Sequence, residues 1–156
     1  MMLRSVAMRT ALAPAPLRTL VLLALCAASA LVAGCGPREE KLAIHGSPRS
    51  SGMDGQVTVT PQPEFGNSKV RVDLTFVTPP DRIAPGARTY VVWDRRGDRL
   101  TRLGQLQFDG ESREAKFEAT TLPGGFELMV TAEPNANVPL PSPQTLLIQR
   151  VVGNAR

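Results

Sequence analysis

The chain has 156 residues, of which 42% are hydrophobic, 21% charged and 4% aromatic, and this size and composition predict one modest folded domain. Its formal net charge is +4, but Arg4, Arg9 and Arg18 precede Cys35 and no acidic residue does. Without these three arginines, 15 basic side chains stand against 14 acidic ones, so the net charge falls to +1. This excludes the main argument for a nucleic-acid-binding surface, because such a surface has to displace counterions from phosphates.

The first 34 residues have the layout of an export signal. Residues 1–19 are basic and lack acids, and an uncharged, mostly apolar run follows at residues 20–33. A membrane-spanning helix needs about 20 apolar residues, and only residues 19–34 separate Arg18 from Cys35. We therefore expect residues 1–34 to act as a signal peptide rather than as a permanent membrane span.

The end of the apolar run, Val32-Ala33-Gly34-Cys35, resembles the lipobox of bacterial lipoproteins. The resemblance implies that a diacylglyceryl group is attached to the thiol of Cys35 and that cleavage falls between Gly34 and Cys35. Each buried methylene contributes about 0.8 kcal/mol, so two or three acyl chains hold a protein firmly on a membrane. The alternative is a generic signal peptide in which Cys35 is incidental.

The segment after the anchor, residues 36–55, is rich in glycine, proline, serine and charge and shows no sustained period. This composition predicts a flexible tether with a root-mean-square span of about 25 Å. His45, the only histidine, falls in it and is interpreted as a solvated loop residue. Cys26 leaves with the leader, so the mature chain keeps only a lipid-blocked Cys35 and no disulfide is expected.

Short alternating segments begin at residue 56 and predict strands. They cover residues 56–60, 69–77, 89–95, 99–108, 112–120, 126–133 and 145–152. In residues 69–77 the alternation places Val70, Val72, Leu74 and Phe76 on one side. Residues 89–95 are apolar on both faces, which is typical of a strand inside a sheet. Residues 99–108 are interpreted as one strand or as two strands broken near Gly104.

Turn residues separate these segments. Arg96-Gly97-Asp98 predicts a turn, Asp109-Gly110 predicts a hairpin turn, and Pro123-Gly124-Gly125 separates two further strands. The proline-rich residues 134–144 are expected to be irregular, either as a stiff crossover to the last strand or as a polyproline ledge for a partner.

About seven strands without helices predict an all-β domain at residues 56–152, an immunoglobulin-like β-sandwich, followed by a tail at residues 153–156. A small β-barrel is the alternative, because alternation does not distinguish two packed sheets from one closed sheet. We expect Trp93 to be buried between the two sheets. Its expected neighbours are Val70, Val72, Phe117 and Leu128.

No arrangement of catalytic residues is predicted, so the protein is expected not to be an enzyme. One tether histidine and one blocked cysteine leave no Ser–His or Cys–His pair, no metal site and no cofactor site. The remaining candidates are the acid groups Asp94/Asp98 and Glu111/Glu114/Glu118, and both are interpreted as solvated faces and turns.

Two charged features could contact a partner. Arg96-Gly97-Asp98 matches an adhesion tripeptide, but a tight charged turn requires the same residue types. Four arginines, at positions 95, 96, 99 and 102, could touch anionic headgroups. Because Asp94 and Asp98 dilute this positive charge, we expect a solvated hairpin instead.

The second half of the domain resembles the extracytoplasmic domain of anti-sigma-K factors and related uncharacterised envelope proteins. The resemblance spans about residues 79–152 and rests on Tyr90-Val91-Val92-Trp93, Leu103-Gly104-Gln105-Leu106, residues 126–134 and the proline-rich stretch before Leu146. The chain shows neither the cytoplasmic sigma-binding domain nor the transmembrane helix of that family. The resemblance therefore implies a stand-alone sensory or protein-contact module, and no sigma-factor partner is expected.

Together these features predict an exported, non-enzymatic protein held outside the cytoplasm by a lipid on Cys35 and contacting another envelope protein. A polysaccharide-binding or adhesive surface module is the alternative function. Gly36 stands where an aspartate often retains lipoproteins in the inner membrane, so the outer membrane is preferred if the cell has two.

Overall fold

The computed structural model describes residues 38–46, 48 and 50–153, so Gly34, Cys35, the predicted leader and residues 154–156 lie outside the described residues. The strands are β1 (Glu40–His45), β2 (Asp54–Gln62), β3 (Asn67–Thr75), β4 (Thr89–Arg96), β5 (Arg99–Asp109), β6 (Glu114–Thr121), β7 (Phe126–Glu133) and β8 (Thr145–Val151). Two short helical turns, η2 (Pro63–Phe65) and α2 (Pro80–Ile83), connect strands. The predicted all-β class is confirmed. None of the helices in the described ranges is long and apolar enough to cross a membrane.

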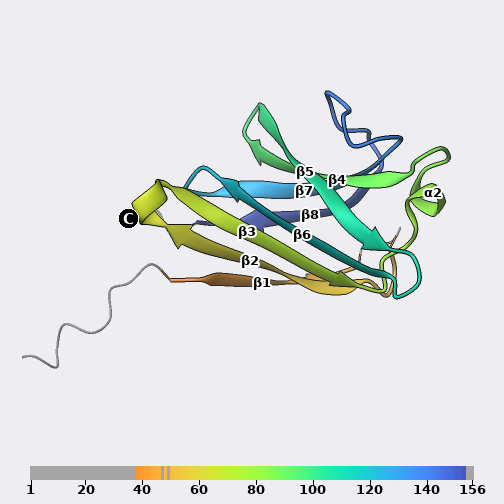
Figure 1. Ribbon diagram of the computed structural model, residues 1–156, viewed down its shortest axis with the longest axis horizontal. Coiled ribbons are helices and arrows are strands. Elements are labelled where there is room, and N and C mark those ends of the chain that lie inside the picture. The colour runs from red at the N-terminus through yellow and green to blue at the C-terminus, as the bar shows by residue number, and fades with distance from the viewer. Residues whose placement is uncertain (1–37, 47, 49, 154–156) are drawn as a thin grey trace, which may run out of the picture. The chain divides into compact units, whose positions relative to one another are not determined.

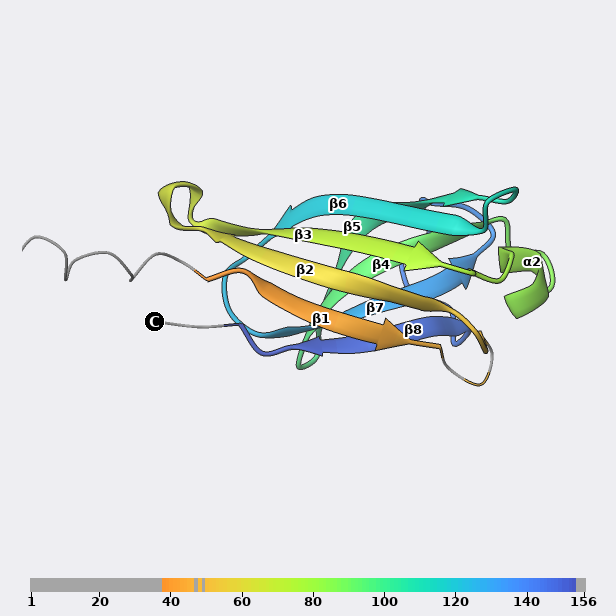
Figure 2. The same ribbon diagram turned by 90° about the horizontal axis from the view of Figure 1, so that it is seen from below.

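The strands form one antiparallel sheet in the order β1-β2-β3-β6-β5-β4-β7-β8. The sheet rolls up until its two edge strands, β1 and β8, approach each other (Figures 1 and 2). The carboxylate of Glu40 accepts hydrogen bonds from the backbone N–H groups of Val152, at 3.5 Å, and Gly153, at 3.3 Å. The architecture is therefore a nearly closed barrel, which matches the barrel alternative more closely than two separate sheets.

Strand β5 connects the two halves of the barrel, one formed by β1, β2, β3 and β6 and the other by β4, β7 and β8. Residues 99–106 pair with β4, whereas residues 107–109 pair with β6. The register with β4 shifts between Val92 and Trp93, next to Gly104. A Cβ atom on Gly104 would lie 3.2 Å from the Phe117 ring, so a larger residue would displace that ring. Residues 99–109 are one strand that changes partners.

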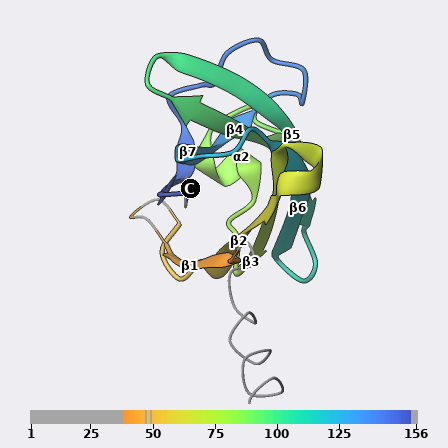
Figure 3. The ribbon, with the colours of Figure 1, turned by 90° about the vertical axis from the view of Figure 1, so that its left-hand side faces the viewer.

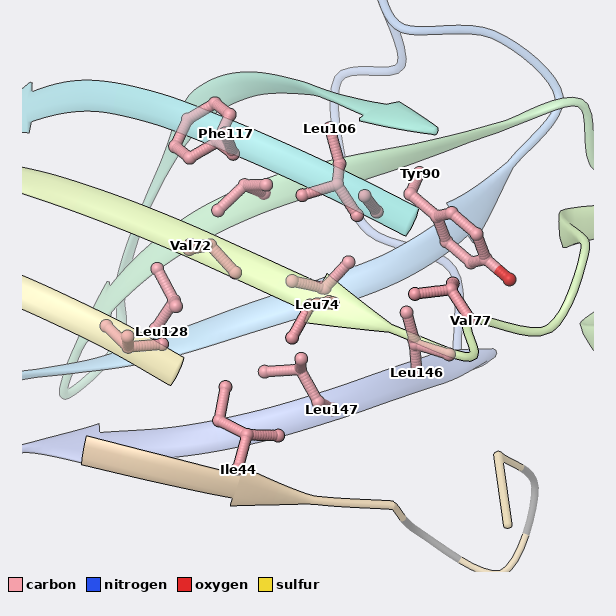
Figure 4. Close-up of a cluster of buried hydrophobic side chains, with 14 of the residues drawn as sticks. Ile44, Val72, Leu74, Val77, Tyr90, Leu106, Phe117, Leu128, Leu146 and Leu147 are labelled. Carbon is pink, nitrogen blue, oxygen red and sulfur yellow. The ribbon is translucent and has the colours of Figure 1, made fainter. Parts of the chain in front are cut away.

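The barrel interior is filled by alternate side chains from both halves of the sheet (Figure 4). Val70, Val72 and Leu74 of β3 face Leu128 and Val130 of β7, as their alternation predicts. At one end, the buried Tyr90 packs edge-on against Phe108 and donates a hydrogen bond to the carbonyl of Thr78. Burial raises the pKa of the Tyr90 phenol above its usual range, so the hydroxyl keeps its proton and this hydrogen bond.

The prediction of a flexible tether over residues 36–55 is wrong where β1 forms. Residues 40–45 pair with β2 from Glu40–Val59 to His45–Asp54, and the side chain of Ile44 is buried in the core. Leu42 and Ile44 alternate with Lys41, Ala43 and His45, but two large apolar residues give too weak a pattern to predict a strand. The folded part of the chain therefore begins well before residue 56.

The alternation predicted through residue 76 ends one residue early. Phe76 has φ +56° and is exposed, while Val77 takes the buried position. The guanidinium of Arg113 donates to the carbonyls of Phe76, at 3.1 Å, and Val77, at 3.2 Å. A left-handed residue reverses the alternation, so the inward placement of Phe76 was wrong.

The hairpin predicted at Asp109-Gly110 is a longer turn over residues 110–113. The carboxylate of Asp109 accepts hydrogen bonds from the Glu111 amide and the Ser112 hydroxyl, both at 2.9 Å. These bonds to the charged form lower the pKa of Asp109. The aspartate therefore caps a four-residue turn.

Trp93 is buried, but not between the two halves of the barrel. Along β4, Tyr90, Val92 and Asp94 point inward, so Val91 and Trp93 face the outside of the sheet. Trp93 packs with Val91 and Met129 in a second apolar cluster against which Leu100 and Val138 pack. Val138 belongs to the irregular segment of residues 134–144, which covers this face. The expected neighbours Val70, Val72, Phe117 and Leu128 lie in the other cluster.

Candidate functional site

Two hollows and a buried ion pair lie at one end of the barrel. We call it the entry end because the described chain enters the barrel there. It contains the start of β1, the η2 connection, the β4–β5 turn, the β6–β7 turn and the end of β8 (Figure 3). The register confirms the grouping, since Gln62 pairs with Asn67, Ser68 with Thr121, Arg96 with Arg99 and Phe126 with Val151.

Arg96 bonds to a buried carboxylate and to two backbone carbonyls at the entry end. Its guanidinium donates from Nε to both oxygens of the buried Asp94 at 3.1 Å and from Nη2 and Nη1 to the carbonyls of Leu122, at 2.6 Å, and Pro123, at 2.8 Å. It also lies over the Phe126 ring, 5.2 Å from the centroid. The Thr121 hydroxyl donates to Oδ2 of the same carboxylate. Arg96 therefore ties β4 to the β6–β7 turn.

A hollow of about 410 Å³, which we call the β5–β6 slot, lies where β5 and β6 separate. Its lining residues are Asn67, Asp94, Arg96, Arg99, Thr101, Leu103, Thr120, Thr121 and Leu122. Thr101 and Thr120 are exposed on opposite walls.

The walls of the slot carry unused hydrogen-bonding capacity. Residues 99–106 of β5 pair with β4, and residues 117–121 of β6 pair with β3. Pairing between β5 and β6 covers only residues 107–109 and 114–116, so within the described residues the opposite edges of these two stretches, which face each other across the slot, have no strand partner. The buried Oδ1 of Asn67 also has no hydrogen-bond partner there. Unpaired strand edges are templates for another strand.

A second hollow of about 530 Å³, which we call the β7–β8 hollow, opens nearby at the entry end. Its lining residues are Arg95, Arg96, Gly97, Gly125, Phe126, Glu127, Arg150, Val151 and Val152. Arg95 forms an ion pair with Glu127 at 2.5 Å. The guanidinium of the exposed Arg150 has no ion-pair partner in the part of the chain that the structure describes, and the same holds for Arg99 in the slot.

The structure separates the four arginines that the sequence places together. Arg95 is paired with Glu127, Arg96 lies inside the entry end, and Arg102 donates to the carbonyl of Ala136 at 2.6 Å. Only Arg99 is left without such a contact among the described residues. The Arg96-Gly97-Asp98 turn is present, with Gly97 at φ +57°, but the internal bonds of Arg96 make it a structural residue rather than a presented one.

The interpretation of Asp94 as a solvated residue was wrong, because it is buried and bonded to Arg96 and Thr121. Glu114 and Glu118 do lie in surface ion pairs. Glu118 pairs with Lys69 at 2.7 Å and Arg71 at 2.8 Å, and hydrogen bonds to these cations lower its pKa. Glu114 pairs with Lys116 at 3.2 Å. His45 is exposed on β1, 3.2 Å from the Asp54 carboxylate. Over the described ranges, no three His, Cys, Asp or Glu side chains group as metal ligands.

Sequence analysis missed a buried polar chain beneath residues 134–144. The Trp93 indole N–H donates to the Thr131 hydroxyl at 2.9 Å, and that hydroxyl donates to the Glu133 carboxylate at 2.6 Å. The Ser142 amide completes the chain with a bond to Glu133 at 2.6 Å. The charged Glu133 at the end of an apolar strand was a signal of this arrangement. The network fixes the proline-rich segment over the outer face as a crossover.

Replacing Arg96 with alanine should destabilise the fold by about 3 kcal/mol, because it leaves the Asp94 carboxylate buried without its cation. Chemical denaturation would measure the loss. Arg99→Ala is the matched control, since Arg99 faces Arg96 across the same turn, and its free energy of unfolding should change by less than about 0.5 kcal/mol. Equal effects of the two substitutions would contradict the structural role of Arg96.

No family model matches the chain, and neither does any curated protein or solved structure. Function therefore has to be inferred from the chain's own residues. These define a small antiparallel barrel with two hollows at its entry end. One of these hollows, the β5–β6 slot, exposes two strand edges.

Proposed function

We propose that this protein is an exported, lipid-anchored envelope protein that acts as a non-enzymatic protein-contact module. The anchor is supported by the sequence Val32-Ala33-Gly34-Cys35, with cleavage before Cys35 and acylation of its sulfur and its new amine. The resemblance to the extracytoplasmic domain of anti-sigma-K factors supports a sensory or contact role outside the cytoplasm. The preferred location remains the outer membrane where the cell has two.

The observation that carries the contact function is the β5–β6 slot. Its two facing strand edges offer backbone N–H and C=O groups to an extended segment of a partner. In strand addition, main-chain hydrogen bonds supply affinity and neighbouring pockets supply specificity. The mixed lining of threonines, Leu103 and Leu122 suits a peptide segment with alternating polar and apolar side chains.

The alternative of a polysaccharide-binding or adhesive module lacks a supporting observation. Carbohydrate sites usually present aromatic faces, but Tyr90 and Trp93 are buried. The exposed Phe65 and Phe76 lie at opposite ends of the barrel, in the η2 connection and after β3.

Site-specific cross-linking in intact envelopes tests the contact function. A photoreactive side chain at Thr101 or Thr120 should capture a discrete protein. Gln56 and Thr75 are matched exposed controls away from the slot and should not capture it. Capture of the same protein from all four positions, or from neither slot position, would contradict the proposal.

A further inference from the structure

We propose that the entry end of the barrel seats directly on the phospholipid surface, with Phe65, Leu122 and Val152 in the headgroup layer and Arg99 and Arg150 on lipid phosphates. This inference rests on the proposed lipidation of Cys35. It assigns the described surface a second contact, with the membrane itself, beyond the covalent anchor.

The length of chain between anchor and barrel is the first argument. Arg38 is three residues after Cys35, so their Cα atoms are at most about 11 Å apart at 3.8 Å per residue. The polar layer of one leaflet is about 5–8 Å thick. Strand β1 begins two residues later, at Glu40. A diacylglyceryl group on Cys35 therefore holds the entry end against the headgroups, where a 20-residue flexible tether would have held it clear.

The distribution of exposed apolar side chains is the second argument. The entry end exposes Phe65 by 69%, Leu122 by 58% and Val152 by 70%. These residues come from three separate connections, namely η2, the β6–β7 turn and the segment after β8. Exposed apolar side chains gathered on one surface mark an interaction site, and binding to an interface scales with the apolar area buried.

The exposed arginines at the entry end favour a contact with lipid phosphates. Arg99 and Arg150 are exposed and have no ion-pair partner in the described part of the chain, and each lines one of the two hollows. A guanidinium binds phosphate through paired N–H donors, and phosphate is common to phospholipid headgroups. Glu64 and Asp98 are also exposed here, so apolar contact rather than net positive charge has to supply most of the affinity.

Fluorescence quenching on the mature lipoprotein in phosphatidylcholine–phosphatidylglycerol vesicles tests the seating. Because Cys26 is removed and Cys35 is blocked, an introduced cysteine is the only free thiol. Labels on Phe65→Cys and Leu122→Cys should lose fluorescence when the lipids carry a headgroup nitroxide. Labels on Phe76→Cys and Leu140→Cys, which are exposed to similar degrees away from the entry end, should not.

The outcomes separate the two proposals. If Cys35 carries its lipid and the protein floats with vesicles, but all four labels are quenched alike, the seating is wrong and the anchor stands. If Cys35 is unmodified and the protein stays in solution, the proposed anchor is wrong and the seating fails with it.

Arg99→Glu with Arg150→Glu should reduce quenching at position 65, whereas Arg82→Glu with Arg88→Glu should not. Equal effects of the two pairs would overturn the phosphate contacts.

Discussion

Replacing Trp93 with alanine should lower the free energy of unfolding by about 3–5 kcal/mol, a large share of a small domain's stability. Trp93 is 1% exposed, and its loss leaves a cavity between β4 and residues 134–144. The substitution also removes the indole N–H that anchors the hydroxyl of Thr131 next to Glu133. The melting temperature of the purified protein measures the effect.

Two control variants separate the packing of Trp93 from its hydrogen bond and from the effect of losing an exposed ring. Trp93→Phe keeps most of the packing and loses one hydrogen bond, so it should cost about 1 kcal/mol plus a small packing loss. Phe65→Ala removes an exposed aromatic ring and should leave the melting temperature unchanged. An unchanged melting temperature for Trp93→Ala would show that the outer cluster does not stabilise the barrel.

Replacing Cys35 with alanine should abolish lipid attachment and lipoprotein-specific cleavage. The substitution removes the sulfur nucleophile but keeps Arg4, Arg9, Arg18 and the apolar run at residues 20–33, so export should still begin. The variant should accumulate as an uncleaved precursor, or leave the membrane as a soluble form if another peptidase cuts near residues 28–33. Electrophoresis of the membrane and soluble fractions distinguishes these forms from the lipoprotein, because the precursor keeps residues 1–34 and the soluble form leaves the membrane fraction.

Cys26→Ala is the matched control, because it removes a thiol inside the leader and should not change processing. If Cys35→Ala remained membrane-bound after the same cleavage as the native chain, Cys35 would not be the attachment site. The protein would then be an ordinary exported domain, and its contact with lipid would have to come from elsewhere.

The alternation of apolar residues predicted most strands of the barrel closely. Residues 126–133 form β7 with the predicted bounds, and Phe126, Leu128, Val130 and Ala132 share its buried face. The same rule did not orient β4, because a strand covered on both sides is apolar on both faces. The side of the sheet on which Trp93 lies depends on the distant segment 134–144, which no local pattern reveals.

Errors at strand ends have a common physical cause. Phe76 departs from the alternation because its backbone adopts a left-handed conformation held by Arg113, 37 residues later in the chain. Strand β1 forms because β2 supplies its backbone hydrogen bonds. Both features depend on tertiary contacts that override the local sequence.

The candidate site was less predictable than the fold. The β5–β6 slot exists because β5 leaves β6 for β4 near Gly104, and a single glycine in a strand only hints at such a change of partner. The four neighbouring arginines suggested a common surface, but successive residues on a strand point to opposite faces. Arg95 therefore pairs with Glu127, whereas Arg96 bonds to the buried Asp94.

Mass spectrometry of the mature N-terminus tests the central claim most directly. The expected first residue is Cys35, carrying the mass of a diacylglyceryl group on its sulfur and an acyl chain on its amine, with residues 1–34 absent. An unmodified cysteine, or a mature chain that starts at any other residue, would contradict the lipid anchor and the placement of the barrel on the membrane surface.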